Sequence, residues 1–275
     1  MTTTGTPMPE LAVTQRLLGL APARGSHQAL AGPANRAYSY GELAAAIQAA
    51  AAGLAWRGLH PRDVVGVHVP DAVCYALATH AIRAAGGVPS PVAAGLTVPE
   101  MAGQLADCGA RMLLTAPPLA AAALAAADRS WVRQVISFAD APGATPFEAL
   151  LKSGSLRAAS GRRGDPALLP YVPLPDGTLG PVALTQRELT AELGRLAVLA
   201  EIAEQDVVIA TPPAGDGRVY TVLLDHALLS GATVVAATLD ALAATAAAWH
   251  ATVAIVPRSR DVRPARSLRV LAVTP

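Results

Sequence analysis

The sequence predicts an α/β fold in which mostly parallel sheets are flanked by helices. Short β-branched runs, such as DVVGVHV at residues 63–69, alternate with longer helical stretches along most of the chain. This alternation is typical of βα units, which place helices on both faces of a parallel sheet. Hydrophobic residues make up 52% of the chain and aromatic residues only 4%, so we expect a closely packed core of alanine, valine and leucine.

The expected helices begin at caps and end at glycines where the sequence supplies them. Asp71 precedes one apolar helical run, and Gly86 and Gly87 end it. Thr97 is followed three residues later by Glu100, which is the pattern of a capping box. The helical stretches lie at residues 10–20, 40–59, 71–85, 97–108, 119–128, 185–200, 219–230 and 239–249.

The expected strands lie between these helices, with one polar interruption. The β-rich runs are residues 63–69, 88–92, 110–115, 131–137, 167–172, 206–211, 232–237, 252–256 and 268–273. The polar stretch at residues 152–165 has the composition of a linker or exposed loop. We therefore expect a first α/β lobe at residues 1–160 and a partial second α/β lobe at residues 161–275.

Composition excludes several classes of function. The 21 basic and 20 acidic residues nearly balance and form no basic block, so we expect no nucleic-acid partner. The opening MTTTGTPMPE has no signal-peptide pattern and no apolar stretch is long enough for a bilayer, so we expect a cytoplasmic protein without a membrane partner. Cys74, Cys108 and the six histidines show no ligand spacing, so we expect no metal site.

Several segments, in order, resemble the amino-terminal part of the adenylate-forming superfamily, which comprises acyl- and aryl-CoA synthetases, adenylation domains of nonribosomal peptide synthetases, and luciferases. These segments are YGEL at residues 40–43, DVV at 63–65, AGG at 85–87 and LSGATVV at 229–235. The resemblance implies that family's fold. The family's later motifs and its small carboxy-terminal domain are not found, so we expect the fold without its C-terminal domain.

The stretch PYVPLPDGTLGPVALTQREL, at residues 170–189, corresponds to the family's phosphate loop. In the family, hydroxyls, backbone N–H groups and a lysine wrap the phosphates of ATP. Here Gly177 and Thr178 remain, whereas Asp176 adds a negative charge and Gly180 stands at the lysine position. The family implies ATP, Mg²⁺ and CoA, but because the motif is lost we expect no cofactor. Asp176, Gly177, Thr178 and the following Thr185 remain candidate ligand-binding residues.

A second family pocket corresponds to PPAGDGRVYTVLL at residues 212–224. The family has an aromatic and a histidine here, at the acyl pocket, and this chain has small residues and an aspartate instead. Asp216 either caps the following helix or acts in catalysis. Arg218 could pair with Asp216 or with a carboxylate ligand, and Tyr220 lies one turn further along. Asp216, Gly217, Arg218 and Tyr220 are therefore candidate ligand-binding residues.

His226 is the other candidate catalytic residue. It follows Asp225 within an apolar helix, and an Asp/His pair can perform acid–base chemistry. Adjacent helical residues point about 100° apart, however, so the two side chains need not share a site.

Three functions remain open. The first is a truncated, degenerate family member that no longer adenylates and serves as a binding or accessory protein for an acyl or aryl small molecule, in specialised metabolism. The second is half of a split acyl-CoA or AMP ligase completed by a partner chain. The third is ATP-independent chemistry in the former acyl pocket. The last strand, at residues 268–273, is a sheet edge, so we expect a homo-oligomer or a partner protein to cover it.

Overall fold

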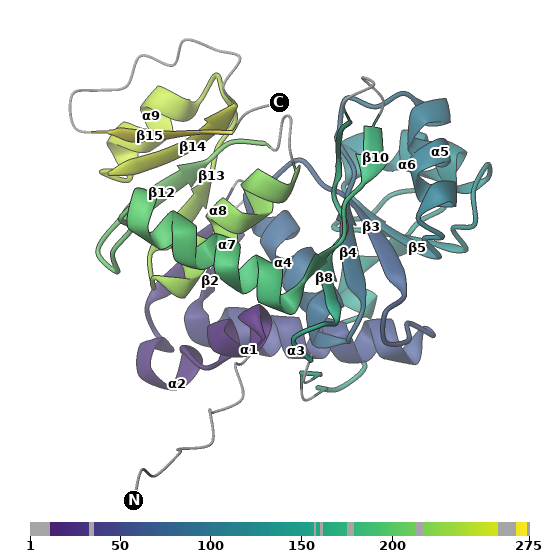
Figure 1. The fold of residues 1–275 in the computed structure, drawn as a ribbon, viewed down its shortest axis with the longest axis horizontal. Helices are drawn as coiled ribbons and strands as arrows, with labels where there is room; N and C mark the ends of the chain where they lie inside the picture. Colours follow the sequence, from purple (N-terminus) through teal and green to yellow (C-terminus); the bar gives the residue numbers. More distant parts are fainter. Residues whose placement is uncertain are drawn as a thin grey trace, which may run out of the picture.

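The computed structural model describes residues 12–32, 36–156, 158–159, 162–174, 179–212, 217–257 and 268–273. Within these residues, helices pack around two larger sheets, and every pairing in those sheets is parallel except one (Figure 1). The predicted α/β class, with mostly parallel sheets flanked by helices, is confirmed. No helix in the described part of the chain is both long and apolar enough to cross a membrane.

The first sheet has five strands and is built from residues 64–146. Its order is β4-β3-β5-β6-β7, and all its pairings are parallel. The helices α5 (Val98–Asp107) and α6 (Ala120–Ala127) cover one face through a cluster that includes Met101, Leu105 and Leu113. The strands are β3 (Val64–His68), β4 (Val88–Pro91), β5 (Met112–Thr115), β6 (Gln134–Ser137) and β7 (Thr145–Pro146).

The second sheet has six strands in the order β15-β14-β12-β13-β1-β2. Two of them, β1 (Gln28–Ala31) and β2 (Ala37–Ser39), come from the start of the chain, where the sequence analysis expected no strand. β1 pairs in parallel with β13, with Leu30 opposite Val234. The remaining elements are β12 (Val207–Ala210), β13 (Thr233–Ala236), β14 (Val253–Pro257), β15 (Arg269–Val273) and the covering helix α9 (Leu242–Ala248).

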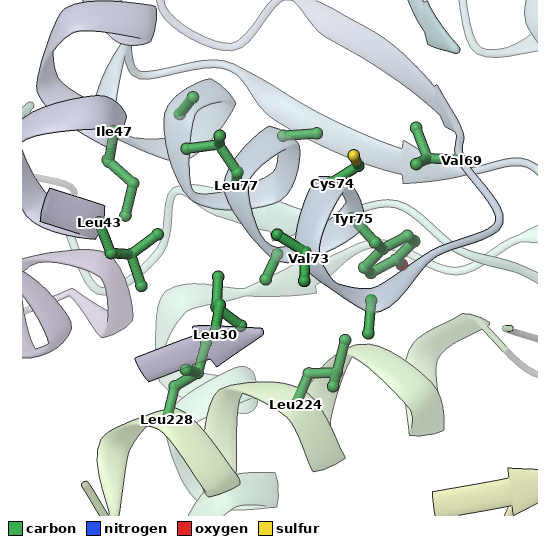
Figure 2. Close-up of a cluster of buried hydrophobic side chains, with 14 of the residues drawn as sticks. Leu30, Leu43, Ile47, Val69, Val73, Cys74, Tyr75, Leu77, Leu224 and Leu228 are labelled. Carbon is green, nitrogen blue, oxygen red and sulfur yellow. The ribbon is translucent and has the colours of Figure 1, made fainter. Parts of the chain in front are cut away.

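A shared core joins the two sheets around the helix α4 (Ala72–Ala84), which is buried along its whole length. Figure 2 shows Val73 and Leu77 of α4 in the same cluster of buried side chains as Leu30 of β1 and Leu224 of α8 (Gly217–Leu229). The helix α3 (Tyr40–Trp56) adds further apolar side chains, such as Ile47. Each sheet therefore buries one face against helices that also contact the other sheet.

The caps agree with the sequence. Asp71 accepts a hydrogen bond from the Cys74 backbone at the start of α4, and Thr97 and Glu100 form the expected capping box on α5. Equivalent boxes begin α3 and α7 (Gln186–Leu199). The short helices α1 (Val13–Leu18) and α2 (Ala21–Arg24) precede β1.

The strand expected at residues 167–172 is wrong in one respect, because the structure divides it. β8 (Pro166–Leu168) pairs with β11 (Leu184–Thr185), whereas β9 (Tyr171–Pro173) pairs with β10 (Leu179–Pro181). Pro170 stands between the two pieces and has no N–H to donate, so one continuous ladder cannot pass through it.

Candidate functional site

Three of the predicted ligand-binding residues, Gly217, Arg218 and Tyr220, lie at the start of α8, and the Tyr220 ring contacts Tyr75 near the start of α4. α4 starts after Asp71, just beyond β3, and α8 starts at Gly217, just beyond β12. In open α/β sheets, ligands bind outside the carboxyl ends of the strands, and helix N-termini carry partial positive charge there. We call the region around Asp71, Gly217 and Tyr220 the helix-terminus site.

Gly217 lets the first turn of α8 approach the other sheet closely. A Cβ atom at Gly217 would lie 2.6 Å from Cβ of Pro91, at the end of β4. Any larger residue would push α8 away from β4. The residue predicted to bind a ligand therefore has a packing role that sequence reasoning did not identify.

Tyr220 lies deep in the helix-terminus site and is 2% exposed. Its ring packs edge-on against Tyr75 with centroids 5.2 Å apart, and Tyr75 shares a 2.6 Å hydrogen bond with the Thr221 hydroxyl. Burial raises the pKa of Tyr220 well above its ordinary value, with smaller contributions from Tyr75 and Asp71, so the phenol stays neutral. Within the described residues, its hydroxyl has no hydrogen-bond partner, which is costly for a buried polar group.

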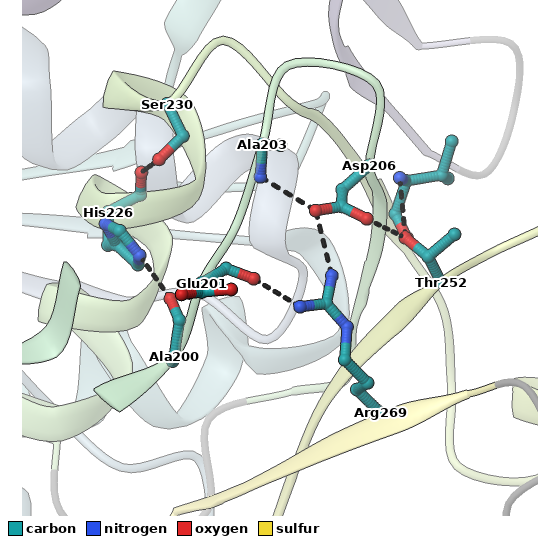
Figure 3. Close-up of polar contacts among 9 residues, drawn as sticks. Ala200, Glu201, Ala203, Asp206, His226, Ser230, Thr252 and Arg269 are labelled. Atoms are coloured by element: carbon teal, nitrogen blue, oxygen red, sulfur yellow. Dashed lines mark hydrogen bonds and ion pairs between the residues drawn. The ribbon is translucent and has the colours of Figure 1, made fainter. Parts of the chain in front are cut away.

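Asp225 and His226 do not pair with each other, which is the outcome that their adjacent helical positions left open. His226 places Nε2 2.8 Å from the carbonyl oxygen of Ala200, beyond the end of α7 (Figure 3). Asp225 turns instead toward α4, where it accepts a 2.8 Å hydrogen bond from Nη1 of Arg83. The angle between adjacent helical side chains sends the two residues to different neighbours.

Asp225 belongs to a buried polar cluster that the sequence analysis missed. Its Oδ1 lies 3.2 Å from Nε2 of His80, whose Nδ1 lies 3.0 Å from the Thr14 hydroxyl on α1. Burial by itself raises the pKa of Asp225, but Arg83 and His80 outweigh it, so the pKa lies below its ordinary value. The sequence did contain a signal for this cluster, because both apolar helices carry ionisable residues: His80 and Arg83 in α4 and Asp225 in α8. The cluster joins α1, α4 and α8.

Other predicted residues are placed separately. Thr185 caps α7, because its hydroxyl exchanges hydrogen bonds with Glu188. Arg218 is half-buried in the first turn of α8. Asp176, Gly177, Thr178 and Asp216 lie outside the described residues. Among the residues that the structure describes, no group of three or more histidine, cysteine, aspartate or glutamate side chains could hold a metal ion.

Comparison with known families decides the ancestry. The family model described as AMP-binding enzyme matches residues 21–260. The chain belongs to this family.

Solved structures of ligases share the fold. A long-chain-fatty-acid-CoA ligase from Archaeoglobus fulgidus superposes with a TM-score of 0.80 at 18% identity over 94% of this chain and 53% of that one. MbtA from Mycobacterium smegmatis superposes with a TM-score of 0.81 at 24% identity, over 90% of this chain and 48% of that one. A benzoate CoA ligase from Burkholderia xenovorans superposes with a TM-score of 0.76 at 23% identity, over 95% of this chain and 55% of that one. The chain thus spans about half the length of these proteins.

The stretch at residues 170–189, which the resemblance aligns with the family's phosphate loop, contains the antiparallel strands β9 and β10 and continues into β11 and α7. A Cβ atom at Gly180 would lie 2.5 Å from Cδ1 of Leu174, so the leucine covers the glycine directly. Tyr171 donates its hydroxyl to Oδ2 of Asp107 on α5, at 2.5 Å. Burial, followed by this bond to Asp107, raises the pKa of Tyr171. The hairpin is thereby fixed against α5.

Proposed function

We propose that this member of the AMP-binding family binds a small acyl or aryl molecule at the helix-terminus site and does not by itself transfer an adenylyl group. The observation that carries the proposal is the contact between Leu174 and Gly180. Gly180 occupies the position at which the resemblance places the phosphate-binding lysine, and an apolar side chain covers it. Gly180 itself therefore offers neither a cation nor a hydroxyl to a phosphate oxygen.

The charge of the loop supports the same conclusion. Asp176 replaces a hydroxyl residue, and the one lysine of the chain, Lys152, lies in a different segment. A carboxylate close to a triphosphate is repulsive by about 4 kcal/mol for two unit charges 4 Å apart near a protein surface. Two prolines, Pro173 and Pro175, remove N–H donors that phosphates use.

The choice of ligand follows from the helix-terminus site. The buried hydroxyl of Tyr220 can donate one hydrogen bond to a ligand oxygen, and the N-terminus of α8 favours negative charge, whereas the carboxylate of Asp71 already caps α4. The surrounding aromatic rings of Tyr75 and Tyr220 and the nearby Pro91 supply apolar surface. This combination suits the carboxylate end of an acyl or aryl acid.

Two measurements test the proposal. Pyrophosphate exchange with saturating ATP and a panel of alkanoic and aromatic acids should give no turnover, and ATP should not raise the melting temperature. Acids of the panel should raise it in the absence of ATP. ATP-dependent turnover by this chain would contradict the proposal, and so would the absence of any shift with the acids.

Tyr220→Phe is the matched variant for binding. Because the Tyr220 hydroxyl has no partner among the described residues, its removal should leave the stability of the unliganded protein unchanged or slightly higher. Acid binding should weaken about tenfold, since the buried hydrogen bond to a charged ligand is lost. Thr190→Val on α7, whose hydroxyl donates to the Gln186 carbonyl of the same helix, serves as the control hydroxyl deletion away from the site. Unchanged acid binding in Tyr220→Phe would remove Tyr220 from the site.

A further inference from the structure

Two tryptophans lie exposed at the opposite end of the parallel strands from the helix-terminus site. Trp56 ends α3 and is 77% exposed, and Trp131 precedes β6 and is 64% exposed. Large aromatic side chains usually bury most of their surface, because each removes about 150–250 Å² from water. Trp56 and Trp131 therefore leave most of their side-chain surface in solvent at one end of the molecule.

Backbone contacts bring these tryptophans and several arginines to the same end. The Gln134 side chain donates a 3.0 Å hydrogen bond to the Arg57 carbonyl, which joins the end of α3 to the start of β6. The Arg133 backbone donates to the Arg111 carbonyl at 2.8 Å, and Met112 pairs with Gln134 in the next register position. We define the tryptophan–arginine patch as Trp56, Arg57, Arg111, Arg129, Trp131 and Arg133.

The patch is positively charged. Arg111, Arg129 and Arg133 are exposed, and none of the ion pairs found within the described residues involves them. Arg57 places its guanidinium carbon 5.9 Å from the centre of the Trp56 ring. Asp128 is the one carboxylate on the loop that carries Arg129 and Trp131. The arginine charges are thus available to an external partner.

We infer that the tryptophan–arginine patch is a docking surface for an acidic segment of another protein, in which carboxylates alternate with large apolar side chains. Tryptophan and arginine are the residues most enriched among those that dominate protein–protein binding energy. Charge complementarity selects the sign of the partner, because carboxylates would meet the unpaired guanidinium groups. A second copy of this chain would present the same positive patch, and like charges across a two-fold interface repel.

The location makes such docking compatible with ligand binding. The patch lies at the amino-terminal ends of β5 and β6, whereas the helix-terminus site lies beyond the carboxyl ends of β3 and β12. A partner on the patch leaves the ligand site uncovered. This inference therefore stands whether or not the proposed function is correct.

A pair of peptides tests the docking surface. Fluorescence titration of the full chain with a helical peptide of leucine and glutamate should give saturable binding and a blue shift of tryptophan emission. The corresponding leucine–lysine peptide should not bind. Binding should weaken as salt rises from roughly 50 to 500 mM, since exposed charges are screened. Equal binding of both peptides, or of neither, would overturn the inference.

Variants place the binding on the patch. Trp131→Ala and Arg133→Glu should each weaken binding of the leucine–glutamate peptide about tenfold. Trp249→Ala at the end of α9 and Arg187→Glu on α7 are the matched controls and should not change it. Because Trp131 and Arg133 are exposed, the fold should tolerate both changes. Equal loss in the controls would overturn the assignment, as would binding to anionic lipid vesicles or single-stranded RNA without binding to the acidic peptide.

Discussion

Replacing Asp225 by asparagine should destabilise the protein strongly, although the change is nearly isosteric. Asp225 is 2% exposed and Arg83 is 5% exposed, and the two are joined by a 2.8 Å ion pair. The variant leaves the buried guanidinium with a hydrogen bond from Nε to the Ala167 carbonyl but no opposing charge. Burial of a charge without its partner is the largest penalty that a single side chain imposes.

The expected loss is about 3 to 5 kcal/mol, the range for breaking one side of a buried ion pair. A double variant that removes both charges, Asp225→Leu with Arg83→Met, should lose only about 1 to 2 kcal/mol, because apolar replacements no longer leave a charge unpaired. The exposed Asp128→Asn should change stability by less than about 0.5 kcal/mol.

Urea unfolding followed by circular dichroism measures these differences, with an unchanged slope showing that the folded state is preserved. The folded pKa of Asp225 is lowered, so its contribution is present above the unfolded pKa of about 3.9 and is lost as the pH falls through the folded pKa. A loss below about 1 kcal/mol for Asp225→Asn, or a double variant as unstable as the sum of the singles, would refute the reasoning.

Two further changes test packing and the second sheet. Gly53→Ala should lower the stability by about 2 kcal/mol or more although alanine has the better helix propensity, because the new Cβ would lie 2.5 Å from the Leu150 backbone. Gly194→Ala is the control: this position on α7 faces open space, so the change should raise the stability by about 0.5–1 kcal/mol in thermal unfolding. Asp206→Asn should cost about 1–3 kcal/mol, because Asp206 accepts hydrogen bonds from the Ala203 backbone and the Arg269 side chain (Figure 3). Burial acts to raise the pKa of Asp206, but these hydrogen bonds outweigh it and lower the pKa, so the stability difference from the natural protein should shrink in urea titrations as the pH falls below the unfolded pKa of about 3.9 and through the lowered folded pKa.

The order of helices and strands was predictable because it depends on local periodicity and caps. Asp71 and Thr97 begin their helices as expected, since a side-chain oxygen can satisfy a free N–H three residues away whatever the rest of the fold does. β1 and β2 were missed for the opposite reason. They are short, and what makes β1 a strand is its pairing with β13, about two hundred residues further along the chain.

The candidate site was predicted less well, because side-chain partners come from other elements. The sequence left open whether Asp225 and His226 act together. In the structure, α4 supplies the arginine that binds Asp225, and the end of α7 supplies the carbonyl that binds His226. Tyr220 was expected to line a pocket, and its burial against Tyr75 required knowledge of how α4 and α8 pack. The covering of Gly180 by Leu174 likewise depends on the hairpin, although the loss of lysine was visible in the sequence.

The position of β1 constrains how the chain folds during synthesis. β1 lies between β2 and β13, so its outer neighbour is available at once while its inner neighbour is made near the end of the described chain. Contacts of such long sequence separation slow folding, because a large loop must close first. The five-stranded sheet, whose strands all lie within residues 64–146, can therefore form on the ribosome at a stage when β1 has no β13 to pair with and its inner edge is exposed. A nascent chain halted before residue 233 should accordingly be more prone to aggregation than the finished protein.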